Sequence, residues 1–149
     1  MKSTIVVIIP TYNEAGNIQN TCQKLLKVLN KLTNYRSHIL IVDDNSPDGT
    51  GNIVKNLMRR NSKLHLLENK HKGGLGAAYK KGMRYAIDKY QADIIFEFDA
   101  DLSHDPEKIP DMLTKLNEGY DMVLGSRYIK GGSIPKNWGL HRKFLSVAG

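Results

Sequence analysis

The chain has 149 residues, one cysteine and a formal charge of +7 from 22 basic and 15 acidic side chains. This length allows one domain with a real hydrophobic core, and the residue composition is that of a folded protein. A lone cysteine excludes a disulfide framework and a cysteine-based zinc site, so Cys22 is predicted to be a small buried residue. The basic excess favours an anionic partner: a nucleotide, a phosphate, a membrane surface or a nucleic acid.

Apolar patterning predicts strands and helices that alternate along the chain. Continuous apolar or β-branched runs predict strands at Thr4–Ile9, His38–Val42, Leu64–Leu67, Asp93–Phe98 and Tyr120–Leu124. Helical spacing of apolar residues predicts helices at Asn17–Leu32, Asp48–Arg60, Gly76–Tyr90 and Pro106–Leu116. The chain from Gly125 onward is expected to form a loop. The predicted fold class is therefore α/β, with a mostly parallel sheet and helices on both faces.

Polar side chains follow four of the predicted strands. Ligands of such sheets bind at the carboxyl ends of the strands, so these residues are expected to converge on one edge. They are Thr11–Glu14, Asp43 with Asp44, Asp99–Asp101, and Arg127. Convergence of four strand ends is harder to explain by chance than any one of these motifs.

Asp99 and Asp101 directly follow the fourth predicted strand. Two carboxylates at this spacing can both face one divalent cation that bridges a diphosphate. The alternative is a solvated or helix-capping acidic loop, because Asp105-Pro106 has the features of a helix start. The position after an apolar strand favours the metal site. The surrounding charge agrees, because nine of the fifteen carboxylates lie in the segment 93–121 and no acidic residue follows it.

The other two loops offer groups for a nucleotide. Tyr12 presents a flat face for a base and Glu14 an acceptor, although capping by Asn13 as helix N-cap is the alternative. Asp44 is expected to accept hydrogen bonds from a ribose or a base edge, while Ser46–Thr50 is expected to be structural turn and cap.

Glycines and cations complete the sequence pattern. Gly73 to Gly76 lack the spacing of a phosphate-binding loop and predict a flexible turn with close backbone approach. Arg127 suits bidentate phosphate binding, with a surface arginine as the alternative. Further positive charge follows it at Lys130, Lys136, Arg142 and Lys143. His104 is the only histidine near the proposed site, and no nucleophile–histidine pattern is apparent.

Five segments together resemble the dolichol-phosphate (polyprenyl-phosphate) mannosyltransferases of glycosyltransferase family 2. They are PTYNE (10–14), VDDNSPDGT (42–50), GLGAAY (74–79), DADLSHDP (99–106) and GSRY (125–128), in the order and spacing of that family. The resemblance implies a GT-A fold and transfer of mannose from GDP-mannose to dolichyl or polyprenyl phosphate, with inversion. It also implies that one such domain spans residues 1–149 and is truncated at its C-terminal, acceptor side.

The resemblance implies roles for individual residues. Nucleotide binding falls to Pro10, Tyr12, Glu14, Val42 and Asp44, and Mg²⁺ or Mn²⁺ binding to Asp99 and Asp101, with Ala100 and Ser103 alongside. Arg127 is implied in phosphate binding and Arg142 in binding the acceptor phosphate. An acceptor phosphate is already anionic, so the reaction needs no protein base. Asn45 replaces the usual glycine of the second motif, a mild change because asparagine tolerates a left-handed conformation.

The sequence also bears on location and on alternatives. The apolar run Ile5–Ile9 is too short for a signal peptide and no stretch approaches a membrane span, so we expect a cytoplasmic protein, peripheral at a membrane. A membrane-anchoring subunit is a possible partner. Alternatives are another sugar donor on the same fold, such as a glucosyl donor, or a noncatalytic nucleotide-sugar-binding module. Nucleic acid is disfavoured, because the carboxylate cluster repels phosphate unless a metal intervenes.

Overall fold

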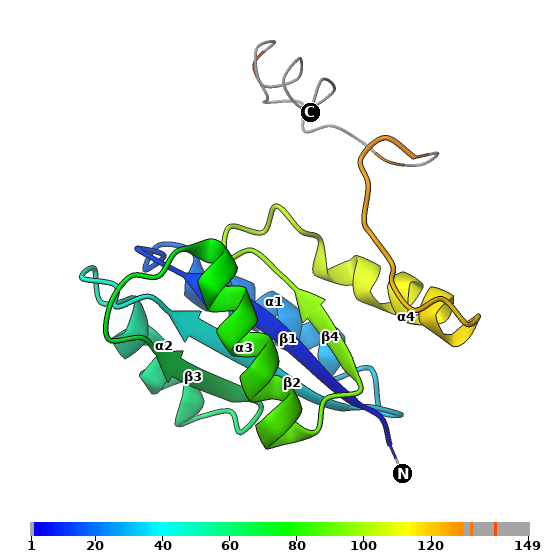
Figure 1. Cartoon of the computed structure of the whole chain (residues 1–149), viewed down its shortest axis with the longest axis horizontal. Coiled ribbons are helices and arrows are strands. Elements are labelled where there is room, and N and C mark those ends of the chain that lie inside the picture. Colours follow the sequence, from blue (N-terminus) through cyan, green and yellow to red (C-terminus); the bar gives the residue numbers. More distant parts are fainter. Residues whose placement is uncertain (1, 130–131, 133–138, 140–149) are drawn as a thin grey trace. The chain divides into compact units, whose positions relative to one another are not determined.

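The computed structural model describes residues 2–129, 132 and 139. The chain forms two units, Met1–Pro110 and Asp111–Gly149, and the first holds the whole sheet. The four strands of this sheet are β1 Thr4–Thr11, β2 Arg36–Asp43, β3 Leu64–Glu68 and β4 Ile94–Glu97. All pair in parallel, in the order β3–β2–β1–β4 (Figure 1). The prediction of a parallel sheet is confirmed.

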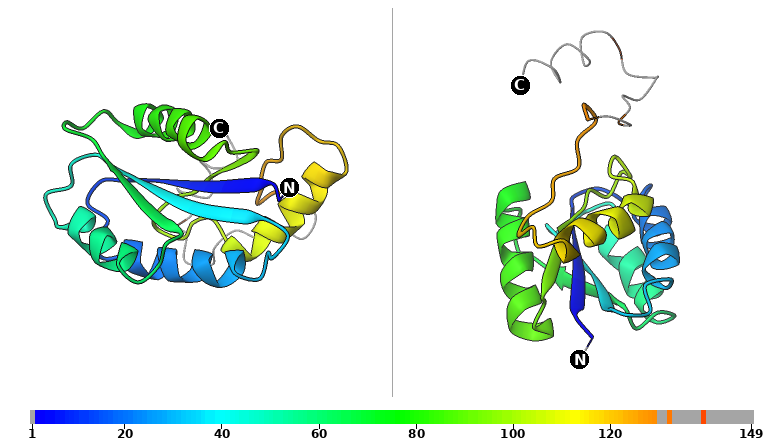
Figure 2. Two further views of the ribbon diagram at one scale, coloured as in Figure 1. Left: turned by 90° about the horizontal axis from the view of Figure 1, so that it is seen from below. Right: turned by 90° about the vertical axis from the view of Figure 1, so that its right-hand side faces the viewer.

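Helices cover both faces of the sheet, as predicted. Helices α1 (Ile18–Leu29) and α2 (Thr50–Met58) lie on one face, and α3 (Leu75–Tyr90) lies on the other (Figure 2). A 3₁₀ turn, η1 (Pro106–Lys108), leads into α4 (Ile109–Asn117). The side chain of Asp105 caps this turn by accepting a hydrogen bond from the Glu107 amide at 3.0 Å.

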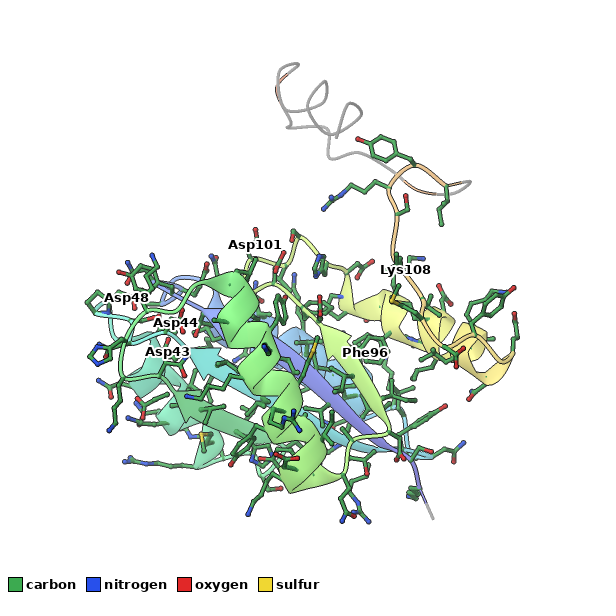
Figure 3. All side chains as sticks on the ribbon, in the orientation of Figure 1. Asp43, Asp44, Asp48, Phe96, Asp101 and Lys108 are labelled. Atoms are coloured by element: carbon green, nitrogen blue, oxygen red, sulfur yellow. The ribbon has the colours of Figure 1, made fainter. Side chains whose placement is uncertain are left out.

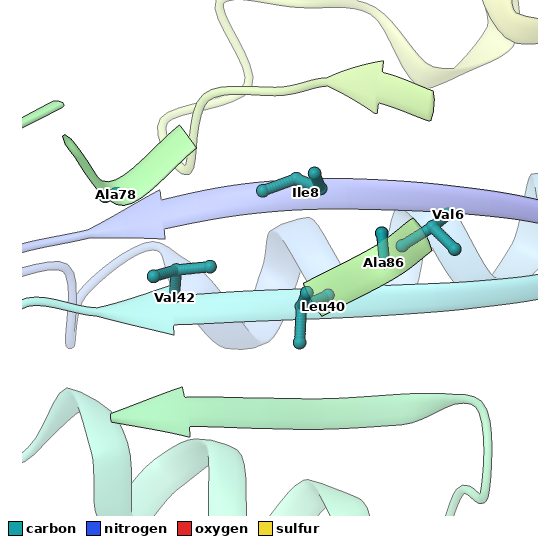
Figure 4. Packing of buried hydrophobic residues seen from close by; sticks show 6 residues of the cluster. All are labelled: Val6, Ile8, Leu40, Val42, Ala78 and Ala86. Carbon is teal, nitrogen blue, oxygen red and sulfur yellow. The ribbon is translucent and has the colours of Figure 1, made fainter. Parts of the chain in front are cut away.

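The core explains why the two central strands read as unbroken apolar runs. Every residue of β1 from Ile5 to Ile9 is fully buried, because alternate side chains face opposite helical layers. Val6, Ile8, Leu40 and Val42 pack with Ala78 and Ala86 of α3 (Figure 4). Cys22 of α1 is buried, as predicted, and burial raises the pKa of its thiol to about 12.

Helix α3 approaches the sheet closely at Gly82. A Cβ atom at this position would lie 2.7 Å from Cγ2 of Ile8 and 3.0 Å from Cγ2 of Val42. Both distances are shorter than ordinary carbon–carbon contact, so the position accommodates only glycine without movement of the strands. The packing distance of α3 therefore depends on this residue.

The prediction of a fifth strand at Tyr120–Leu124 is wrong. Those residues form no strand in the described part of the chain, and Tyr120, Met122 and Leu124 are 60%, 71% and 75% exposed. Alternation of apolar residues is typical of a strand, but a strand forms only where a neighbour supplies hydrogen bonds. Within the described residues, none pairs with this segment.

We expect two neighbouring histidines to make the stability of the sheet sensitive to pH. Nδ1 of His38 on β2 lies 3.0 Å from Nε2 of His65 on β3, and Tyr90 stacks on His38 at 4.5 Å. Burial lowers the pKa of both rings, and for His38 the neighbouring His65, Arg36 and Lys63 lower it further. The unfolded chain therefore binds more protons than the folded chain below their ordinary pKa of 6.5.

We expect the stabilisation from this pair to be present above the unfolded pKa and lost as the pH falls through the lowered values. The midpoint of urea unfolding should drop between about pH 7.5 and about pH 5. The double variant His38→Gln/His65→Gln should flatten that dependence, whereas His71→Gln, at an exposed loop position, should leave it unchanged. An unaltered slope in the double variant would contradict the assignment.

Candidate functional site

A cavity of about 260 Å³ opens at the carboxyl edge of the sheet. The loops after all four strands and the start of α3 line it, with Pro10, Thr11, Tyr12, Glu14, Asp44, Lys72, Gly74, Leu75, Ala78, Asp99, Ala100 and Asp101. Figure 3 labels two of these residues, Asp44 and Asp101, on the loops that follow β2 and β4. The expected convergence of strand ends is therefore found for the first, second and fourth predicted strands.

Side chains of the loop after β2 and of Thr50, the first residue of α2, hold the loop after β1. The backbone amides of residues 13, 14 and 15 donate, in that order, to Ser46 Oγ at 3.0 Å, Thr50 Oγ1 at 3.0 Å and Asp48 Oδ2 at 2.9 Å. The Thr50 hydroxyl also donates to Asp48 at 2.6 Å, and these hydrogen bonds lower the pKa of Asp48. We refer to these contacts as the loop clamp, because they fix the backbone that carries Glu14.

Asn13 does not cap the first helix, so the alternative of Asn13 as helix N-cap is wrong. The N-cap of α1 is Asn17, and the amides of Asn17 and Ile18 donate to the carbonyl of Glu14. Asn13 instead adopts a left-handed conformation with φ of 61°, which turns the chain between strand and helix. Asn45 does the same with φ of 59°, so the expectation that asparagine suits this turn is confirmed.

Asp43 ends β2 and Asp44 follows it, and the two carboxylates differ in their surroundings. Asp43 is buried and accepts hydrogen bonds from the Thr11 hydroxyl at 2.8 Å, the Ser46 amide at 2.9 Å and the Ser46 hydroxyl at 2.6 Å. It joins the ends of β1 and β2 and does not line the cavity. Its contacts are those of a structural residue.

Asp44 lines the cavity and also anchors the loop after β3. Its carboxylate accepts the Asn69 side-chain amide and the backbone amides of Gly73 and Gly74, the latter two at 3.0 and 2.9 Å. Gly74 has φ of 84°, a conformation that favours glycine. The predicted close backbone approach of these glycines is therefore confirmed, and its target is Asp44.

Asp99 and Asp101 share one wall of the cavity. Asp99 accepts hydrogen bonds from the hydroxyls of Tyr79 and Ser103, both at 3.3 Å, and Nε2 of His104 lies 3.6 Å from its Oδ2. The Ser103 amide donates to Asp101 at 2.8 Å, and this bond is the main reason that the pKa of Asp101 is lowered. Burial, and then the charge of Asp99, raises the pKa of the Tyr79 hydroxyl, which therefore stays a hydrogen-bond donor.

These residues fit a hard divalent cation. Mg²⁺ and Mn²⁺ prefer oxygen ligands, and Mg²⁺ is commonly held by one or two carboxylates together with substrate phosphates. The described residues contain no group of three or more histidine, cysteine or acidic side chains that could hold a metal ion. Two carboxylates on the cavity wall, with room for a diphosphate beside them, satisfy the requirement.

The sequence did not indicate two residues at the site: Lys72, which lines the cavity, and Tyr79, which does not line it but contacts the lining residue Asp99. Lys72 places its Nζ 3.6 Å from the centroid of the Tyr12 ring, and Tyr79 reaches Asp99 from α3. The only sequence signal for Lys72 is its position in the basic run before the glycine turn. Tyr79 belongs to a recognised motif, yet its apolar helical spacing suggested a core residue.

The remaining predicted residues lie elsewhere or outside the described structure. Val42 is fully buried in the core, and Ser103 contacts both aspartates without lining the cavity. Arg127 belongs to the second unit, Asp111–Gly149. Arg142, Lys130, Lys136 and Lys143 lie outside the described residues.

The family profile described as "Glycosyl transferase family 2" matches residues 6–147, almost the whole chain. The chain belongs to glycosyl transferase family 2. Membership agrees with the predicted resemblance and with the carboxylates found at the carboxyl edge of the sheet.

Curated relatives of this family 2 chain are polyprenyl-phosphate mannosyltransferases. Identity is 38% over 145 residues with undecaprenyl-phosphate mannosyltransferase of Micrococcus luteus, covering 97% of this chain and 56% of that protein. It is 37% over 149 residues with polyprenol monophosphomannose synthase of Mycolicibacterium smegmatis, covering 95% and 51%. It is 37% over 142 residues with dolichol-phosphate mannosyltransferase of Pyrococcus furiosus, covering 95% and 38%. The chain thus spans about half the length of the first two.

Solved structures confirm the GT-A type of fold for this family 2 chain. A mannosyltransferase from Pyrobaculum calidifontis, in complex with GDP-Man and Mn²⁺, matches with a TM-score of 0.55 at 27% identity, over 65% of this chain and 27% of that one. TarS from S. aureus in complex with UDP-GlcNAc matches with a TM-score of 0.59 at 24% identity, over 77% and 31%. The second likeness concerns the fold alone. Among the described residues, no helix is both long and apolar enough to cross a membrane.

Proposed function

We propose that this chain is the donor-binding part of an enzyme that transfers mannose from GDP-mannose to dolichyl or polyprenyl phosphate. The observation that carries the proposal is the cavity into which Tyr12, Glu14, Asp44 and the Asp99–Asp101 segment converge. The curated relatives support the mannosyl group and the lipid phosphate, because their names specify both. The complex of the Pyrobaculum protein supports GDP-mannose as donor.

Different residues are proposed to bind different parts of the donor. Tyr12 offers an aromatic face to the base. Pro10 in β1 and Val42 in β2, with Glu14 and Asp44 in the loops that follow these strands, are also proposed to hold the nucleoside. Asp99 and Asp101, with Ala100 between them, are proposed to hold a divalent cation on the diphosphate, and hydrogen bonds from Ser103 orient both carboxylates. Bound Mg²⁺ or Mn²⁺ stabilises negative charge on the leaving diphosphate.

The reaction requires alignment more than proton transfer. An oxygen of the acceptor phosphate attacks the anomeric carbon of mannose from the face opposite GDP, the bond from that carbon to the diphosphate oxygen breaks, and GDP leaves with the electron pair. The configuration at the anomeric carbon is inverted. The acceptor oxygen is already anionic, so no protein base is needed. This agrees with a cavity whose polar wall is mainly carboxylate.

The proposal for the acceptor side concerns two arginines later in the sequence. Arg127 is proposed to bind phosphate and Arg142 to bind the phosphate of the lipid acceptor. The lipid places the reaction at a membrane surface, and we propose the cytoplasmic face, with a membrane-anchoring subunit as a possible partner. Residues 1–149 are proposed to act as one GT-A domain within the longer enzyme that the relatives represent.

Calorimetric titration tests the donor assignment. GDP-mannose and UDP-glucose are titrated into the 149-residue chain, each with and without Mn²⁺. We expect GDP-mannose to bind in a metal-dependent manner and UDP-glucose to bind more weakly. Tighter binding of UDP-glucose would contradict the mannose assignment and favour another sugar donor on the same fold. Absence of binding to either ligand by the folded chain would contradict a donor site formed by these residues.

A further inference from the structure

Lys72 is the only basic side chain among the described residues that line the cavity. It shares the wall with four carboxylates, those of Glu14, Asp44, Asp99 and Asp101. This wall repels a nucleoside diphosphate through like charge, and one divalent cation offsets only part of the repulsion. A positive side chain at the wall is therefore the group that attracts an anionic ligand most strongly.

The ammonium group of Lys72 contacts the ring of Tyr12. Nζ of Lys72 lies 3.6 Å from the centroid of the Tyr12 ring, which is a cation–π contact between two lining residues. The ammonium thus covers one face of a ring that the proposed function assigns to a nucleobase. A base stacked on that face and the ammonium exclude one another.

The backbone on either side of Lys72 is tied to the end of β2. Asn69 precedes it and Gly73 and Gly74 follow it, and all three donate hydrogen bonds to the carboxylate of Asp44. The loop therefore keeps Lys72 beside the cavity, while its four-carbon side chain retains several rotatable bonds. Displacement of the ammonium from Tyr12 requires only side-chain rotation.

We propose that Lys72 binds the diphosphate of the nucleotide donor. The ammonium rests on the Tyr12 ring in the empty site and turns to the phosphate oxygens when the base takes its place. This exchange is favourable because a charge-assisted hydrogen bond to phosphate is stronger than an exposed cation–π contact. The inference rests on the proposed function and adds a donor-binding residue that none of the recognised binding positions includes.

The test compares ligands that differ in phosphate. Guanosine, GMP and GDP are titrated calorimetrically at saturating Mn²⁺ into the wild-type chain, Lys72→Met, Lys72→Arg and Lys70→Met. Methionine keeps an apolar chain of similar length over Tyr12 but removes the charge, and arginine keeps the charge. Lys70 lies in the same loop, is exposed and does not line the cavity, so it controls for net charge.

We expect Lys72→Met to weaken GDP binding by roughly 10-fold or more and guanosine binding by less than about 3-fold. Lys72→Arg and Lys70→Met should stay close to wild type for all three ligands. Equal losses for guanosine and GDP would assign Lys72 to the Tyr12 ring alone and overturn the proposal, as would wild-type GDP affinity in Lys72→Met. A wild-type chain that binds GDP separates these failures from failure of the proposed function, in which the wild type binds none of the three.

Discussion

Asp101→Asn should abolish metal-dependent binding of the donor. The substitution keeps the shape of the side chain and an oxygen that accepts from the Ser103 amide, but it removes a negative charge from the proposed cation site. Loss of a partner that only orients a metal ligand typically costs about 10- to 100-fold in affinity. We expect the loss of a direct ligand to reach at least about 100-fold in the apparent affinity for Mn²⁺ measured with GDP present.

The measurement is a titration of Mn²⁺ into the chain at saturating GDP, followed by calorimetry or by the spin-resonance signal of free Mn²⁺. Asp88→Asn on the exposed side of α3 changes the net charge equally without touching the cavity. It should bind Mn²⁺ as the wild type does. If Asp101→Asn also retains wild-type affinity, the cation is bound elsewhere and the metal assignment is wrong.

Gly82→Leu should unfold the sheet layer or strongly destabilise it. A Cβ at this position already lies 2.7 Å from Cγ2 of Ile8, and leucine adds three further carbons against the same strand. Overpacking of a core typically costs about 1–3 kcal/mol and occasionally more, and we expect about 3 kcal/mol or more here. That is a large part of the roughly 5–15 kcal/mol that stabilises a typical domain.

Urea unfolding followed by circular dichroism measures this effect. Gly82→Ala should give an intermediate loss, because alanine supplies the clashing Cβ alone. Gly76→Ala is the matched control on the same helix, since a Cβ there meets nothing within 4 Å. It should stabilise the chain by up to about 1 kcal/mol through helix propensity. An unchanged midpoint for Gly82→Leu would mean that α3 can move away from β1 at little cost.

The fold was predictable where hydrophobic patterning is strong. The apolar run Thr4–Ile9 predicted strand β1, and the alternation of strands with helices predicted the parallel sheet. Tyr120–Leu124 failed because its pattern indicates strand propensity, whereas strand formation depends on a hydrogen-bonding neighbour that local sequence does not specify. The sequence left open whether Asn13 caps the helix, because the same residue types occur at helix caps and in left-handed turns.

The candidate site was predictable as a set of strand ends but not in its internal contacts. Residues 10–14, 44 and 99–101 follow strands and therefore meet at one edge of the sheet. The contact of Lys72 with Tyr12 joins residues sixty positions apart in the sequence, which lie in the loops after β3 and β1. Such contacts arise from how the loops fold against each other, and no periodicity in either loop signals them.

The loop clamp has a consequence for protein engineering. The amides of residues 13–15 find their acceptors in Ser46, Thr50 and Asp48, so neither segment holds its shape independently of the other. Grafting only one of these loops from a relative with different donor preference leaves amides without acceptors, or acceptors without donors. Chimaeras that aim to change the nucleotide should therefore exchange segments 11–15 and 45–50 together, as a single cassette.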